Sequence, residues 1–289
     1  MELLGKDVAN ELIKDIEGFH FHSSNFKIKK EFGRASRLQA SVAGIGDDKR
    51  IKLSKDICEF EITNLVDLFY VAIIVCHEVA HYLNNHTSHI DKSSVDFTAL
   101  EVWADFFGAR IFITAITFGS RTQKLIKRFC SEIEQEQILI SIGRAIKDIY
   151  KYIYLQNDDK RYPPALERVL IFNAGASSFF YRLYQELTPE FSLKIILTIL
   201  KEADLTDTVG RFEENKTKNL EIKAKISSMH QALQGKDASI TKNLKPLYYP
   251  FLTTNYFQSP SEIKSSRQQM YDQIKRLGFE PDEIMAMHT

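Results

Sequence analysis

Cysteine is scarce in this chain of 289 residues, which contains only Cys58, Cys76 and Cys130. Three cysteines without a regular spacing offer no framework of disulfide bonds. Sparse, unpaired cysteine is typical of proteins that work in a reducing compartment. We therefore predict a cytoplasmic protein.

A surplus of charge of either sign is also absent. Lys and Arg together number 38, as do Asp and Glu, and the sequence pI is about 7.1. A chain without a net basic field has no general attraction for nucleic acid or for an anionic membrane surface. We expect neither as a partner.

Long apolar runs are missing as well. The two longest, LVDLFYVAIIVC and IFITAITF, are shorter than the roughly 20 residues that span a bilayer, and the first contains Asp67. The N-terminal MELLGKDVANELIKD has the pattern of a charged amphipathic helix and not of a signal peptide. The sequence also has no glycine-rich phosphate loop and no internal repeat, so neither a membrane protein nor a repeat fold is expected.

Helical periodicity dominates what the sequence does contain. One exception is RLQASVAGIGDDKRIKLS, where Leu38, Ala40 and Val42 alternate before a turn and Ile51 and Leu53 resume the alternation, which predicts two short strands. The class is therefore expected to be mostly α (α+β), with a small sheet near the N-terminus. The expected helices are 2–17, 63–85, 98–117, 121–154, 164–186, 190–203, 213–233 and a last helix from Pro260 to about Gly278 that Ser259 and Glu262 cap.

The segment VCHEVAHYLNNH places two histidines four residues apart within an apolar helical pattern. Positions i and i+4 lie on one face of a helix, so His77 and His81 can direct their ring nitrogens to one point. Glu78 lies about 100° around the helix, where its carboxylate can accept a proton from water at the metal. This HExxH pattern predicts a Zn²⁺ site with Glu78 as general base. The alternative is a pair of hydrogen-bonded histidines on a partly buried helix.

A catalytic zinc needs a third protein ligand. The next expected helix offers ALEVWADFFGARI, in which Glu101 and Asp105 again share one face. We predict Glu101 as the third ligand and Asp105 as the acceptor of the outward N–H of a ligand histidine. The alternative for Glu101 is a capping box with Thr98, and the alternative for Asp105 is an exposed carboxylate on the helix. His86 and His89 are rival candidates for the third ligand.

The two motifs together, His77-Glu78-Val79-Ala80-His81 and Glu101-Val102-Trp103-Ala104-Asp105, resemble the HExxH and ExxxD motifs of the gluzincin metallopeptidases. Their flanks resemble Ste24-like and Lit-type phage-exclusion peptidases, over roughly residues 63–120. The resemblance implies a zincin-like lobe over 1–120, with the small sheet and an active-site helix, and the same roles for His77, Glu78, His81, Glu101 and Asp105. The remaining residues, 121–289, are expected to form a helical lobe that completes the cleft.

DDKRYPPALERVLIF resembles a Ste24-like segment in which a histidine precedes proline and arginine, and Tyr162 stands at the histidine position. Tyr162 and Arg168 are therefore candidates for contact with an oxyanion or the substrate. The alternative is a helix begun by proline whose arginine pairs with Glu167 or Asp158. We prefer the alternative for both residues.

The function that this reading favours is a zinc-dependent metalloendopeptidase that hydrolyses a cytoplasmic protein or peptide. The competing hypothesis is a non-catalytic, zinc-containing regulatory or protein-binding module. Unrestrained activity would damage the cell, so we expect narrow specificity, a protein partner that activates or inhibits, as in phage defence, or a lid. Residues 246–289, an aromatic connector and terminal helix, are the candidate lid, unless Tyr248, Tyr249, Phe251 and Phe257 belong to the core.

Overall fold

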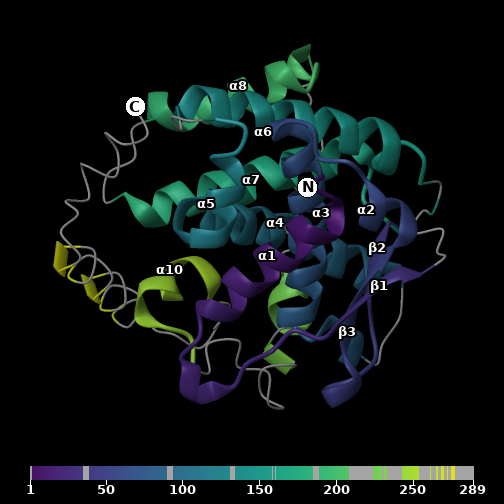
Figure 1. The fold of residues 1–289 in the computed structure, drawn as a ribbon, viewed down its shortest axis with the longest axis vertical. Coiled ribbons are helices and arrows are strands. Elements are labelled where there is room, and N and C mark those ends of the chain that lie inside the picture. The colour runs from purple at the N-terminus through teal and green to yellow at the C-terminus, as the bar shows by residue number, and fades with distance from the viewer. Residues whose placement is uncertain are drawn as a thin grey trace.

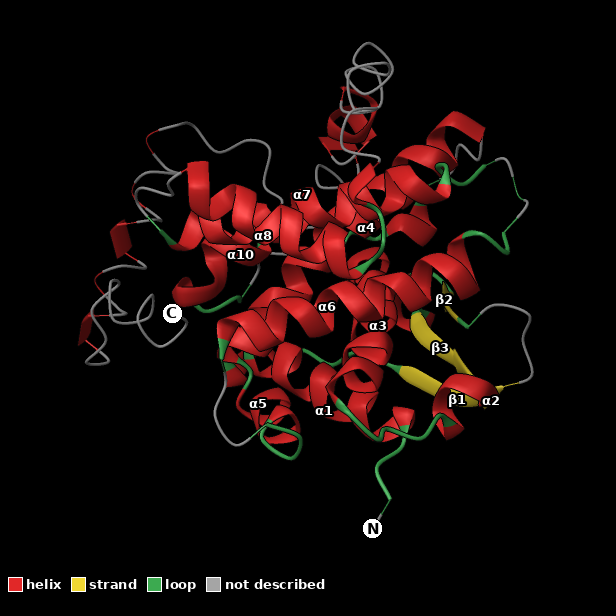
Figure 2. Ribbon diagram, turned by 90° about the horizontal axis from the view of Figure 1, so that it is seen from above, coloured by secondary structure: helices red, strands yellow, loops and turns green. Residues whose placement is uncertain are grey.

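The computed structural model describes residues 2–34, 39–89, 94–130, 134–157, 159, 161–184, 189–207, 224–229, 231–232 and 243–253, with isolated positions from 261 to 276. Helices make up most of the molecule and a small sheet lies at one edge of it (Figures 1 and 2). The predicted mostly α (α+β) class is confirmed. The helices are α1 (Gly5–Gly18), α2 (Lys55–Glu59), α3 (Leu65–Leu83), α4 (Ser94–Phe118), α5 (Ser120–Ile126), α6 (Gln135–Ile149), α7 (Ala165–Leu183), α8 (Pro189–Glu202) and α10 (Tyr249–Leu252).

The sheet contains β1 (Lys30–Arg34), β2 (Ala40–Ala43) and β3 (Arg50–Ser54) in the order β1-β3-β2. The predicted pair β2 and β3 is present and antiparallel, with Val42 opposite Ile51. The parallel strand β1 was not predicted, because KEFGR has no alternation of apolar residues. β2 is therefore an edge strand, with β3 on one side only.

Helix α3 is the central element of the fold. It begins at Asn64, whose side chain accepts hydrogen bonds from the amides of Val66 and Asp67, and it packs against α1, α4, α6, β2 and β3. In length and composition α3 alone among the described helices could cross a bilayer, but 83% of its apolar window is buried inside the fold. Burial on all sides explains its apolar character, because a helix within a core has no solvent-facing stripe.

Helix α4 begins at Ser94, four residues before the predicted start. It crosses α3 closely at Gly108, where an added Cβ would lie only 2.9 Å from the Cα of His77. Thr98 therefore lies inside the helix, and its hydroxyl donates to the carbonyl of Arg161. The capping-box role for Glu101 is wrong, because Glu101 is not in the first turn.

The single helix predicted over 121–154 is wrong. α5 ends at Ile126 and α6 begins at Gln135, and a π-helical turn, η4 (Tyr150–Tyr154), follows α6. Tertiary contacts fix the start of α5: Asp15 of α1 accepts hydrogen bonds from the amides of Arg121 and Thr122, which holds α5 against α1. α6 instead packs on α3 and α8.

One hydrophobic core contains buried residues from Val8 in α1 to Leu252 in α10. In the connector, Phe251 is fully buried and Tyr248 stacks on Phe19 at 4.1 Å between ring centroids. This part of the predicted lid, 246–252, is therefore core. Phe257 and most of the predicted terminal helix lie outside the described residues, as does most of 213–233. The division of the chain near residue 120 stays a prediction.

Candidate metal centre

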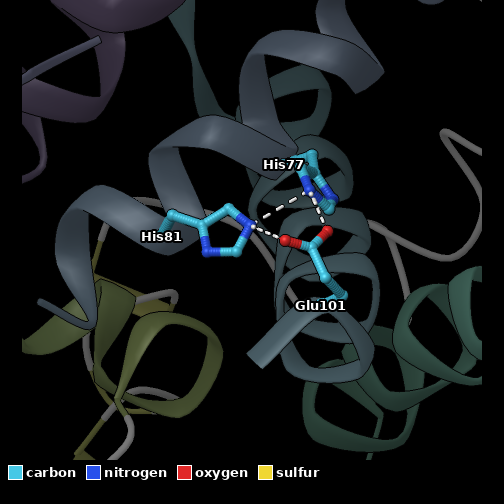
Figure 3. A group of neighbouring side chains, drawn as sticks. All are labelled: His77, His81 and Glu101. Carbon is cyan, nitrogen blue, oxygen red and sulfur yellow. Dashed lines mark hydrogen bonds and ion pairs between the residues drawn. The ribbon is translucent and has the colours of Figure 1, made fainter. Parts of the chain in front are cut away.

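Three side chains from two neighbouring helices converge on one point (Figure 3). His77 and His81 extend from α3, and Glu101 extends from α4. Their nitrogen and oxygen atoms all lie within 4.8 Å of one another, and this is the one group of three or more potential ligands among the described residues. The predicted ligand set is therefore brought together, and the group could bind a metal ion.

The two histidines lie close to each other and to different oxygens of the Glu101 carboxylate. His77 Nε2 lies 3.1 Å from His81 Nε2, 3.3 Å separate His77 Nε2 from Glu101 Oε2, and 3.3 Å separate His81 Nε2 from Glu101 Oε1. Ligand atoms at 2.0–2.1 Å from a tetrahedral zinc lie about 3.3–3.4 Å apart. The three residues offer nitrogen and carboxylate oxygen, which zinc and other divalent metal ions accept, so the group is compatible with a metal ion.

The outward face of His77 is held by a buried ion-pair network. His77 Nδ1 lies 2.9 Å from Asp105 Oδ1, although the ring N–H does not point squarely at that oxygen. Arg168 from α7 donates through Nε and Nη2 to the two oxygens of Asp105, at 2.7 and 2.8 Å. Tyr154 donates to Asp105 at 3.4 Å, and the guanidinium of Arg168 lies 4.0 Å from its ring centroid. Asp105 thus orients His77 while Arg168 orients Asp105.

The electrostatics of the site favour positive charge at the convergence point. Burial alone would lower the pKa of His77, but Asp105 and Glu101 outweigh it and raise that pKa to about 10. Burial opposes ionisation of Asp105, yet Arg168 and His77 hold its pKa below the ordinary value. The pKa of Glu101 is likewise well below its usual range, against the effect of burial, because of His81 and His77. The two ionised carboxylates lie on opposite sides of the His77 ring, and both stabilise positive charge there, whereas Glu101 alone faces the convergence point.

His86 does not join the three ligand atoms. It lies instead on the far side of His81, with 2.8 Å between the two Nδ1 atoms. His89 Nε2 lies 3.5 Å from Asp96 Oδ2. The predictions of His86 and His89 as rival ligands are therefore wrong in this geometry. Nδ1 of His86 faces His81, and Nε2 of His89 faces Asp96.

Glu78 lines the cleft that contains the metal group. The cleft has a volume of about 720 Å³, and Glu78 is buried, with 8% of the residue exposed. Burial raises the pKa of its carboxyl. The cleft is lined by residues of α3 and by Ala40, Ser41 and Val42 of β2. Residues of α4, η4 and the segment before α7 also line it.

Tyr162 and Arg168, the candidates for contact with an oxyanion or the substrate, both line the cleft. Tyr162 lines the cleft, where its ring meets Phe97 edge to face at 5.1 Å between centroids. Arg168 is 5% exposed, and its ionic partners are Asp105 and, at 3.9 Å, Glu101, so its proposed pairing with Glu167 is wrong in this geometry. Asp158 lies outside the described residues.

The sequence interpretation missed Tyr154 and the role of His86. A histidine five residues after a ligand was a visible signal for His86. No local sequence pattern indicated Tyr154, because its position near Asp105 depends on the π-helical turn that follows α6. Such turns are frequent at functional sites.

Comparisons with models of protein families, with curated proteins and with solved structures find no match for this chain. The function is therefore argued from the geometry of the site.

Proposed function

We propose that this chain is a zinc-dependent metallopeptidase of the gluzincin type. The observation that carries the proposal is the convergence of His77, His81 and Glu101 at separations of 3.1–3.3 Å, with Glu78 beside them in an open cleft. A structural zinc site is closed and usually rich in cysteine, whereas a catalytic site has three protein ligands and an accessible position. Cys76, the cysteine nearest in sequence, is fully buried and lies outside the ligand group.

Bound zinc would supply Lewis acidity, which polarises a substrate carbonyl and makes water a stronger acid. Glu78 is placed to accept the proton of the attacking water and to deliver it to the leaving amine. The raised pKa of Glu78, caused by burial, supports this role, because a general base works best with a pKa closer to neutral pH.

The cleft wall supports a peptide as substrate. β2 is an edge strand that lines the same cleft as His77 and Glu78. An extended peptide can add to such an edge through main-chain hydrogen bonds. We propose that the substrate is a protein segment bound in this way along Ala40–Ala43.

Tyr162 is our candidate for stabilising the negative charge that develops on the carbonyl oxygen. Burial, together with the charge of Glu101, raises the pKa of Tyr162 to about 12, so its hydroxyl keeps its proton at neutral pH and can donate. Arg168 is assigned to positioning, because Asp105 occupies its guanidinium.

The test compares the wild type with Glu78→Gln, which fills the same space and cannot accept the proton. Glu59→Gln is the matched control, since Glu59 is 65% exposed on its side chain and far along the chain from the motif. Metal content is measured by mass spectrometry, and cleavage by peptide mapping of proteins from cells that make each variant. We expect one zinc per chain in all three proteins and new protein termini only with the wild type and the control.

Equal cleavage by Glu78→Gln and the wild type would contradict the peptidase mechanism. Zinc in the wild type without any cleavage product would favour the alternative, a non-catalytic zinc-containing binding module. We also propose that activity is restrained, so that generic substrates such as casein are cut poorly by the purified protein. Efficient digestion of casein would refute this restraint.

A further inference from the structure

The turn after α3 folds the chain back onto its own metal ligands. Asn85 adopts a left-handed conformation, with φ 57° and ψ 31°, and the short 3-10 helix η3 (His86–Ser88) follows. This reversal returns His86 to the ring of His81, with 4.9 Å between ring centroids and 79° between their planes. His86 is 5% exposed, so the contact is shielded from bulk water.

We propose that His86 is the positioning residue for His81, accepting the proton of its outward nitrogen. This inference rests on the proposed metal site. A neutral imidazole carries one N–H, and the Nε2 of His81 faces His77 and Glu101. Metal ligation through Nε2 therefore requires the proton on Nδ1, which lies 2.8 Å from His86 Nδ1. His86 must then carry its own proton on Nε2, so that its Nδ1 lone pair is available.

The turn that carries His86 is held by contacts with neighbouring elements. Lys49, the residue directly before β3, donates to the carbonyl of Tyr82 at 2.7 Å and to the side chain of Asn85. Asn84 is buried and donates to the carbonyl of Ala80 at 2.8 Å. Both contacts hold the turn against the end of α3, which keeps the acceptor aimed at His81.

The residue that faces the outward nitrogen of His77 is a carboxylate, whereas the residue that faces the outward nitrogen of His81 is a histidine, and charge explains this difference. His77 faces a carboxylate, Asp105, whose charge is balanced by Arg168. A second carboxylate behind His81 would add a buried negative charge, which is costly to desolvate. A neutral imidazole supplies the acceptor without that charge.

The test measures zinc affinity of purified, metal-free full-length protein by competition with a chromophoric chelator. His86→Leu removes the acceptor, whereas His86→Asn keeps an acceptor near the position of Nδ1. Loss of an outer partner of a ligand lowers metal affinity about 10- to 100-fold, so we expect that loss for His86→Leu and recovery to within about threefold for His86→Asn. His89→Leu is the matched control, since His89 belongs to the same turn and faces Asp96. Its affinity should be unchanged.

A second measurement needs no variant. Long-range nitrogen–proton NMR spectra of the zinc-loaded wild type, labelled with ¹⁵N-histidine, report which ring nitrogen carries each proton. We expect the proton on Nδ1 of His81 and on Nε2 of His86. A proton on Nδ1 of His86 would overturn the inference, as would wild-type affinity in a folded His86→Leu protein. Failure of the wild type to bind zinc would instead refute the metal site itself.

Discussion

The ion pair between Arg168 and Asp105 offers the sharpest test of how the site is held together. Its side chains are 6% and 1% exposed, and the guanidinium makes two hydrogen bonds, of 2.7 and 2.8 Å. Arg168→Met keeps much of the length and apolar contact of the side chain and removes the charge. Asp105 would then lose the cation that holds both its oxygens and keep only His77 beside it, and removal of one partner from a buried ion pair costs about 3–5 kcal/mol of unfolding free energy.

The loss of unfolding free energy on Arg168→Met depends on the burial of the ion pair, and an exposed ion pair in the same chain provides the control. Arg144 makes a comparable contact with Glu202, 3.0 Å from Nε to Oε2, but its side chain is 59% exposed. Solvent screening limits such a pair to about 0–1 kcal/mol, so Arg144→Met should be nearly neutral. Urea unfolding of metal-free protein, followed by circular dichroism, measures both variants.

Asp105→Asn completes a double-mutant cycle. The double variant has neither an uncompensated carboxylate nor an unpaired guanidinium, so it should be more stable than the sum of the single effects predicts, by about 1–3 kcal/mol. Arg168→Met should also weaken zinc binding about 10- to 100-fold, because Asp105 no longer holds His77. A cost for Arg168→Met no larger than that for Arg144→Met would refute this reasoning.

Three further predictions concern the scaffold. Gly108→Ala should cost about 1–3 kcal/mol by forcing α4 away from α3, whereas Gly18→Ala, which meets nothing within 4 Å, should stay within about 0.5 kcal/mol in the same urea assay. Asp15→Ala should cost about 1–3 kcal/mol, because the amides at the start of α5 lose their acceptor, and Asp15→Asn, which keeps one acceptor oxygen, should recover part of that loss. Burial lowers the pKa of Lys49 from 10.5 to about 8, so the folded chain holds fewer protons than the unfolded chain between these values, and Lys49 should favour a rise in unfolding free energy with pH across that window. NMR of ¹³C-dimethylated lysines should show one signal titrating near pH 8, and its absence would contradict the burial of this amine.

The ligands on each helix could be read from the sequence because they depend on local geometry. Four residues make slightly more than one helical turn, so His77 and His81 share a face wherever α3 is placed, and the same holds for Glu101 and Asp105. The hairpin of β2 and β3 followed from alternation and a glycine turn, which are also local. These features agree with the structure for that reason.

Strand β1 and the break between α5 and α6 were not predictable in this way. β1 pairs in parallel with a strand about 20 residues later, and its own residues are too polar to mark it as a strand. α5 is held to α1 by Asp15, more than 100 residues before it, whereas α6 packs on α3 and α8. Contacts of such range leave no periodic signal in the segment that they shape.

Only the tertiary structure brought the pair His77 and His81 together with the pair Glu101 and Asp105 and supplied the residues that hold them. α4 can approach α3 closely because Gly108 has no side chain at the crossing. Arg168 reaches Asp105 from a helix 63 residues later, and the π-helical turn turns Tyr154 toward the same carboxylate. The sequence by itself determined which donor atoms each helix presents, because helical spacing is a property of the backbone. Their convergence was decided by packing, because the distance between two helices depends on every side chain that lies between them.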